Sequence, residues 1–202
     1  MRNCFGKIKS EEKDMFIKSV KQANVKGYLK LEIDTGEGIA RILLSDGQYD
    51  ALGRPTPCEE ISDEDFRFAM RGDEYNGAKK KALNILSFGD NSESALSLKL
   101  ARAGFSREVR ETVVSEMKAL GYIDEERQIA RLIETEASVK LRGPKKIIAQ
   151  LSAKGYPADK IKETLRRLEI EKIIDFSEIK QKLIADVSDE EQRRKILYKS
   201  GF

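Results

Sequence analysis

Apolar and polar residues alternate with a period of two in the first quarter of the chain. The alternation runs through residues 28–34 and again through residues 39–44, which is typical of strands that bury one face. Asp46 and Gly47 make a favoured hairpin turn, after which residues 48–52 are expected to form a third strand. The residues before the first of these runs are polar and weakly patterned. The sequence therefore predicts a small N-terminal β-meander.

The pattern becomes helical after residue 58. Ser62 is followed by three acidic residues, an arrangement that predicts a helix start. Residues 78–86 place apolar side chains on one helical face and three lysines on the other. The next helix is expected to begin at Ser92 and to end at Gly104. The fold class predicted for the chain is therefore mainly α.

A corner with the pattern Leu-x-x-x-Gly-aromatic occurs three times, at intervals of about fifty residues. In this corner leucine makes the last core contact, glycine takes the left-handed conformation that ends the helix, and the aromatic ring packs back over the turn. The helices after the first two corners match almost residue for residue once one insertion is allowed. The three corners end at Phe105, Tyr156 and Phe202. We therefore expect tandem three-helix repeats in an elongated array.

The repeats predict where the parts of the chain begin and end. The third helix of the first two copies is expected to start near Asp124 and Asp175, and the third copy at a capping box that begins with Ser188. That copy is incomplete, which indicates a naturally short chain or a truncated one. The predicted parts are an N-terminal β-containing segment (1–57), a first helical repeat with a lead-in helix (58–138), a second three-helix repeat (139–186) and an incomplete third repeat (187–202).

Composition argues against catalysis and against a metal site. The chain has no histidine, the side chain best suited to proton transfer near neutral pH, and its two cysteines are Cys4 and Cys58. Structural zinc prefers four ligands of these two kinds. No apolar run approaches the roughly 20 residues that a membrane span needs, and the N-terminal residues do not resemble a signal peptide. We therefore expect a cytoplasmic protein that is not an enzyme, binds no metal or cofactor, and has no membrane partner.

The net charge of +3 is modest, but the charges are unevenly distributed. Residues 139–170 carry nine Lys and Arg against three acids, whereas residues 108–137 carry eight acids against four basic residues. Such alternation suits a ligand that presents both signs, for instance a protein assembled on nucleic acid. A solvated helix face is the alternative interpretation. The candidate filament- or DNA-binding residues are Lys140, Arg142, Lys145, Lys146 and Lys154, together with Arg102, Arg107 and Arg110 around the first corner.

Two further groups have a functional and a structural interpretation. The acids at residues 124–126 could hold a metal ion, but their position at a predicted helix start favours capping. The aromatic residues that follow glycines could stack on exposed bases, as in single-strand binders. Because they lie at corners, we expect them in the core instead. They are Phe105, Tyr122, Tyr156 and Phe202.

A set of residues between 78 and 202 has an order and spacing that is specific as a whole. The set comprises Ala82 and Leu83 with Leu86, Ser92, Leu96, Lys99 and Leu100, Gly104 and Phe105, Gly121 to Asp124, Lys140, Gly143, Ile147, Leu151, Lys154 and Gly155, and the final Gly201 and Phe202. In these residues the chain resembles the RecX family of recombinase regulators. It departs from the family at Ala95, where glutamate is usual, and near Ile129, where an aromatic-Ala pair is usual.

The resemblance implies a non-enzymatic regulator that binds RecA-type filaments on DNA and lies along their groove across neighbouring protomers. It implies inhibition of ATP hydrolysis and strand exchange, and hence modulation of recombination, DNA repair and the SOS response. Single- or double-stranded DNA is a further candidate partner, and the chain is expected to act as a monomer. One alternative is a helix-turn-helix transcription regulator, although three corners argue against it. The other is a carboxylate-metal nuclease that uses Asp124.

Overall fold

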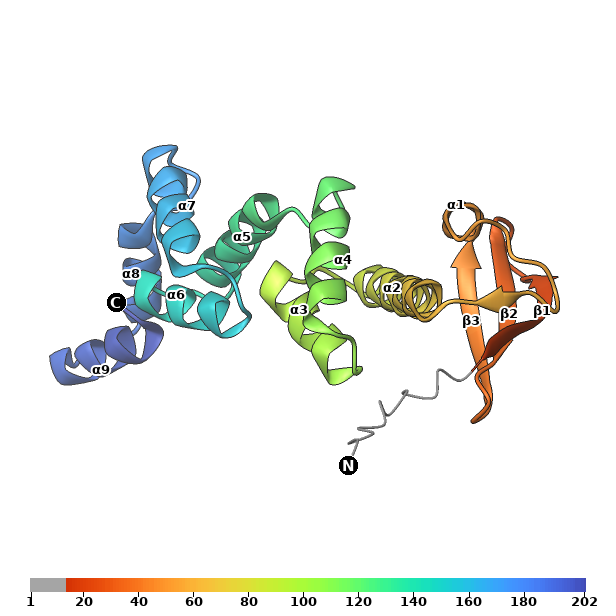
Figure 1. Cartoon of the computed structure of the whole chain (residues 1–202). Coiled ribbons are helices and arrows are strands. Elements are labelled where there is room, and N and C mark those ends of the chain that lie inside the picture. The colour runs from red at the N-terminus through yellow and green to blue at the C-terminus, as the bar shows by residue number, and fades with distance from the viewer. Residues whose placement is uncertain (1–13) are drawn as a thin grey trace, which may run out of the picture. The chain divides into compact units, whose positions relative to one another are not determined.

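The computed structural model describes residues 14–202 (Figure 1), so Cys4 lies outside the described residues. Contacts divide the chain into two compact units, with the boundary between Lys80 and Lys81. The predicted mainly helical fold with a small N-terminal sheet is confirmed. The two units are broader than the four predicted parts, whose boundaries stay a prediction.

The first unit contains an antiparallel sheet with the strand order β3-β2-β1-β4. Both predicted strands are present, because residues 28–34 form β2 and residues 39–44 lie in β3. The alternation does not predict β1, because a bulge between Ile17 and Ser19 shifts its inward-facing positions by one residue. The strands are β1 (Met15–Gln22), β2 (Tyr28–Asp34), β3 (Ile39–Ser45) and β4 (Glu60–Ile61).

The predicted third strand at residues 48–52 is wrong, because this segment belongs to helix α1 (Asp46–Ala51) and its C-cap. The Ser45 hydroxyl accepts a hydrogen bond from the Gln48 backbone N–H at 3.3 Å, and the Gln48 side chain accepts one from the Ser45 N–H at 2.9 Å. This reciprocal capping box starts a helix at the predicted hairpin turn.

Helix α2 (Asp63–Ser87) begins after Ser62 as predicted. Two of its side chains satisfy the outer edge of β3: Asp73 Oδ1 accepts from the Leu43 N–H at 2.7 Å, and Asn76 Nδ2 donates to the Leu43 carbonyl at 2.8 Å. These bonds replace a strand partner for Leu43, which otherwise leaves unpaired backbone groups at a sheet edge. They fix this part of α2 against the sheet.

The second unit holds the end of α2 and the helices of the repeat (Figure 1). The first copy consists of α3 (Glu93–Arg102), α4 (Arg107–Ala119) and α5 (Glu125–Glu134), which continues as the π-helical turn η1 (Thr135–Val139). The second consists of α6 (Pro144–Ala153), α7 (Ala158–Ile170) and α8 (Phe176–Ile184). Helix α9 (Glu190–Ser200) opens the third, and its N-cap is Asp189 instead of the predicted Ser188.

The first two copies correspond without a gap. Helices α4 and α7 both have 13 residues, and α7 starts at Ala158, 51 positions after Arg107. The same offset relates the N-caps Asp124 and Asp175, which confirms the two predicted helix starts. The predicted insertion between the copies is therefore wrong.

The three corners have the predicted backbone conformation. Gly104, Gly155 and Gly201 have φ angles of 92°, 87° and 90°. In each corner the N–H of the aromatic residue donates to the carbonyl of the leucine five positions earlier, at 3.0 to 3.3 Å. The predicted core position is confirmed for Tyr156, which is buried, and is wrong for Tyr122, which is 53% exposed. Phe105 and Phe202 are half-buried.

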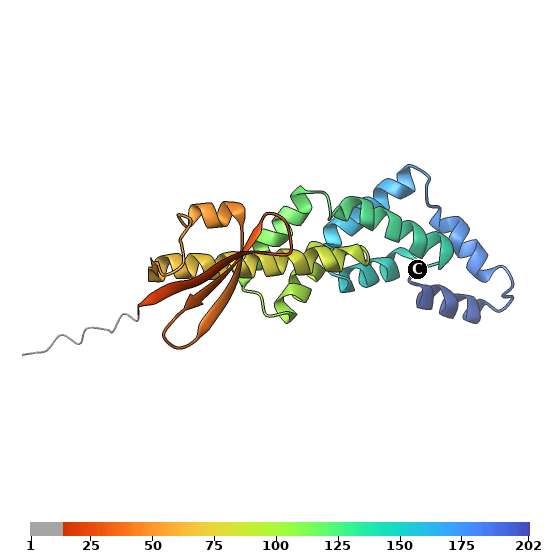
Figure 2. The same ribbon diagram turned by 90° about the vertical axis from the view of Figure 1, so that its right-hand side faces the viewer.

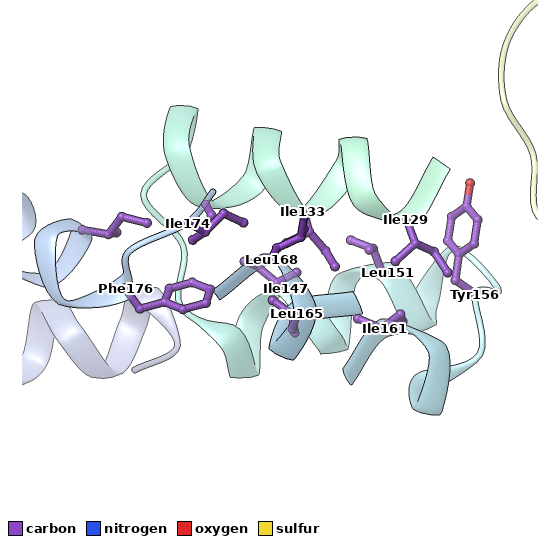
Figure 3. Packing of buried hydrophobic residues seen from close by; sticks show 12 residues of the cluster. Ile129, Ile133, Ile147, Leu151, Tyr156, Ile161, Leu165, Leu168, Ile174 and Phe176 are labelled. Carbon is purple, nitrogen blue, oxygen red and sulfur yellow. The ribbon is translucent and has the colours of Figure 1, made fainter. Parts of the chain in front are cut away.

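One apolar core holds the second copy together with the third helix of the first. Ile133 from α5, Ile147 and Leu151 from α6, and Leu165 from α7 meet in its centre (Figure 3). Both views of the whole chain show α5, α6 and α7 side by side (Figures 1 and 2). The core therefore joins successive copies as well as filling one of them.

Candidate functional site

Two of the predicted contact residues belong to an internal ion-pair cluster. Lys140 Nζ lies 2.7 Å from one carboxylate oxygen of Glu136, and the Arg142 guanidinium contacts the other oxygen and the Gln150 side chain. The Glu136 side chain is only 4% exposed, in the π-helical turn η1. Lys140 and Arg142 therefore neutralise a buried carboxylate of their own chain.

The charge of Glu136 is maintained by these two cations. Burial alone would raise the pKa of Glu136, but hydrogen bonds from Lys140 and Arg142, together with their positive charges, lower the pKa below its ordinary value. Glu136 thus stays ionised where the chain passes from η1 to α6.

The predicted residues around the first corner fall into two classes. Arg107 forms an i,i+4 ion pair with Glu111 at 2.7 Å, and Arg110 donates to backbone carbonyls of Ser97 and Ser106 at 3.4 and 3.3 Å. Arg102 is exposed, and no side-chain partner for it occurs among residues 14–202. Only Arg102 of this group presents an uncompensated charge.

The remaining predicted residues surround the second corner. Lys146 Nζ donates to the Lys199 carbonyl at 2.8 Å, whereas Lys145 and Lys154 are exposed and have no side-chain partner in the described part of the chain. Lys162 and Arg166 on α7 are also exposed in this way. The sequence signal for these two is their i,i+4 spacing on the polar face of α7, opposite the buried positions.

Part of the charge alternation along the sequence is satisfied between the copies. Lys160 of α7 reaches Glu125 of α5 at 2.9 Å, and Arg167 reaches Glu126 at 2.7 Å. The hydrogen bond to Glu125 raises the pKa of Lys160. The basic second copy therefore pairs with the acidic end of the first, and these charges need no external ligand.

Glu125 is the centre of the joint between the first and second copies. It is buried, and while one oxygen accepts from Lys160, the other accepts from the Glu93 backbone N–H at 3.1 Å. The Glu93 side chain in turn lies 2.7 Å from Lys118 Nζ. A single carboxylate thus ties α5 to the first turn of α3 and to α7.

The corner of the second copy lies on the first turn of α3. The Ser92 hydroxyl, which caps α3, donates to the Lys154 carbonyl at 3.0 Å. A Cβ added at Gly155 would lie 2.8 Å from that hydroxyl and 3.2 Å from the Cβ of Ser94. Glycine is therefore required at this corner by close approach as well as by its φ angle.

Tyr156 completes this joint. Its hydroxyl donates to the Gln128 side chain at 2.9 Å, where both groups are buried. Burial, followed by the negative charges of Asp90 and Glu125, raises the pKa of Tyr156 to about 12. The hydroxyl is therefore a permanent hydrogen-bond donor.

The third copy repeats the arrangement on the first turn of α6. The Gly143 N–H donates to the Ser200 carbonyl at 2.7 Å, and the Lys145 N–H donates to the Gly201 carbonyl at 3.2 Å. A Cβ at Gly143 would lie 2.5 Å from the Gly201 carbonyl oxygen, which explains why glycine caps α6 where serine caps α3. Two joints of one kind therefore connect three copies.

The acidic start of α5 has a structural role. Asp124 accepts from the Arg127 N–H at 3.0 Å and caps the helix, which confirms the capping interpretation. Residues 14–202 contain no group of three or more His, Cys, Asp or Glu placed to hold a metal ion. Among the same residues, no helix combines the length and the apolar character that crossing a membrane requires.

Curated proteins named regulatory protein RecX resemble the chain, although no family model matches it. The protein of Clostridioides difficile is 29% identical over 110 residues, which are 54% of this chain and 51% of that relative. A protein of Thermus thermophilus is 32% identical over 93 residues, 46% of this chain and 63% of the relative. The match thus spans about half the length of these relatives.

Solved structures share the fold. A crystal structure of regulatory protein RecX matches with a TM-score of 0.69 and 20% identity, over 93% of this chain and 94% of that chain. The crystal structure of RecX from Lactobacillus salivarius matches with a TM-score of 0.53 and 22% identity, over 64% of this chain and 89% of that chain. The fold and its joints define a regulatory protein of tandem three-helix repeats with a small N-terminal sheet. The chain belongs to the RecX family.

Proposed function

We propose that this chain binds RecA-type recombinase filaments on DNA and inhibits ATP hydrolysis and strand exchange. The similarity to proteins named regulatory protein RecX supports this proposal. Inhibition of this kind modulates recombination, DNA repair and the SOS response.

The joint at Glu125 is the observation that carries the proposal. A filament presents the same surface on every protomer at a constant spacing, so a binder that contacts two protomers needs two contact surfaces at a constant spacing. The buried contacts of Glu125 and the close approach at Gly155 hold the first two copies in one register. Successive repeats held in this way suit a repetitive partner.

The uncompensated cations are the proposed contact residues. Phosphates and acidic side chains both attract such groups, so the surface suits recombinase and DNA together. Lys140, Arg142 and Arg107 are not included, since each is paired with an acid of its own chain. The proposed contacts are Arg102, Lys145, Lys154, Lys162 and Arg166.

A recombinase ATPase assay on single-stranded DNA tests the proposal. We expect inhibition well below one molecule per protomer, because each bound molecule restrains several protomers. The double variant Lys145→Glu and Lys154→Glu should raise the concentration for half inhibition by about tenfold, whereas Lys182→Glu, which alters an exposed ion pair on α8, should leave it unchanged. Absence of inhibition at equimolar protein would refute the proposed function.

The same preparation distinguishes the alternative of a helix-turn-helix regulator. Such a protein dimerises and protects one palindromic site. Protection of a single site in naked duplex DNA, without an effect on recombinase, would favour that alternative.

A further inference from the structure

The two joints of the helical unit use equivalent residues. In each, the corner of one copy contacts the first turn of the first helix in the preceding copy: Gly155 lies on α3 and Gly201 lies on α6. The contacted residues also correspond, because Ser92 and Gly143 are the N-caps of α3 and α6. This chain therefore contains two examples of what such a first turn binds.

One corner is left without a first turn. A Cβ added at Gly104 would meet nothing within 4 Å, in contrast to Gly155 and Gly201. Among residues 14–202, no backbone N–H outside the regular helices donates to the carbonyls of Ala103 and Gly104, although the equivalent Ser200 and Gly201 carbonyls both accept such bonds. Arg102 adds an exposed positive charge to this free corner.

One first turn is left without a corner. In α9, Asp189 caps the Gln192 N–H at 2.7 Å, while the N–H of Glu191 has no acceptor among the described residues. The equivalent N–H in α6, that of Lys145, donates to the Gly201 carbonyl. Asp189, Glu190 and Glu191 are exposed and make this turn acidic.

We propose that a second copy of this chain supplies the missing partner, so that the Gly104 corner of one molecule docks on the first turn of α9 in another. By equivalence with the internal joints, the Glu191 N–H donates to the Gly104 carbonyl, and the Gln192 amide replaces Lys146 as donor to the carbonyl of Arg102. The charges are complementary, because the basic side chain of Arg102 meets the acids of α9.

Such contact is head to tail, because the two surfaces differ. A heterologous contact leaves one free end on each side and produces open chains of molecules. Its ion pairs are exposed and therefore weak and sensitive to salt. The association should appear at high protein concentration and weaken as salt increases.

Sedimentation velocity of the full chain tests the proposal over a concentration range up to about 1 mM, where weak interfaces associate. The wild-type protein should show a sedimentation coefficient that increases with concentration. Arg102→Glu and Glu191→Lys should each remain monomeric, whereas an equimolar mixture of the two variants should associate again, since each end then meets an opposite charge. Glu169→Lys, at an exposed acid on α7, is the matched control and should behave as wild type.

Three results would overturn the proposal. They are a wild-type protein that stays monomeric over the whole range, a pair of variants that associate as well as the wild type, and a mixture that stays monomeric. Circular dichroism of each variant at low concentration shows whether its helices are intact. The test is independent of recombinase, so its failure leaves the proposed function untouched.

Discussion

Glu125 and Glu126 are neighbours with different environments. The Glu125 side chain is 6% exposed and serves two partners, whereas the Glu126 side chain is 73% exposed and pairs only with Arg167. A carboxylate costs much more to bury than to leave in water, so Glu125 depends on its hydrogen bonds in a way that Glu126 does not.

We therefore expect Glu125→Gln to destabilise the chain by about 1–3 kcal/mol, because the amide has no negative charge for Lys160. Glu126→Gln should change stability by less than about 0.5 kcal/mol, as expected for an exposed pair. Urea unfolding followed by circular dichroism measures both. Equal effects would show that the joint is not organised by Glu125.

The corner glycines allow a similar comparison. Gly155→Ala and Gly104→Ala both place a Cβ on a left-handed residue, which costs roughly 1–2 kcal/mol. Only at Gly155 does the new Cβ also meet Ser92 and Ser94. Gly155→Ala should therefore be less stable than Gly104→Ala by a further 1–3 kcal/mol, roughly the cost of overpacking. Thermal unfolding at low protein concentration gives the comparison.

At the level of elements, the corners and caps were predictable because they depend on few residues close in sequence. Ser62, Ser92 and Asp124 start helices, and Gly104 ends one, as the pattern predicts. The same local chemistry also predicts α1, since Ser45 and Gln48 form a capping box, but the competing hairpin signal at residues 46 and 47 led to the wrong assignment.

Other elements required information that a local pattern lacks. The bulge after Ile17 removes the alternation from β1, and β4 has only two residues. The candidate contact surface was predicted in part, because clustering of positive charge does not show which cations have partners. Glu136 lies four residues before Lys140 and six before Arg142, yet only the π-helical turn η1 brings all three together.

The connection from η1 to α6 should respond to pH. Because the folded state lowers the pKa of Glu136, its ionised form stabilises the fold above the unfolded pKa, and this contribution is lost as pH falls through the folded pKa. Glu136→Gln should therefore be less stable than wild type by about 1–3 kcal/mol at pH 7, and the difference should shrink below about pH 4. Urea titrations at pH 7, 5 and 3.5 follow the change. A difference that stays constant over this range would contradict the assignment.

At the level of the whole molecule, the two compact units have separate cores. Leu31 is fully buried in the sheet core and Leu151 in the helical core. Replacing either with alanine should cost about 2–5 kcal/mol within its own unit.

Hydrogen exchange measured by mass spectrometry locates these losses. Leu31→Ala should speed exchange in β1 to β3 and leave α5 to α8 protected, whereas Leu151→Ala should do the reverse. Faster exchange throughout the chain in both variants would mean that the two units unfold as one.

The joints also bear on how proteins of this family differ in length. The 110 matched residues make up 51% of one relative, while 106 matched residues make up 39% of another, so these relatives are not equally long. Each joint is formed by the end of one helix and the beginning of an equivalent helix, so duplicating or deleting a complete copy regenerates the same contact. Genetic changes in such chains should therefore be tolerated as whole modules of about fifty residues, whereas inserting a single amino acid within a corner would misalign every module that follows.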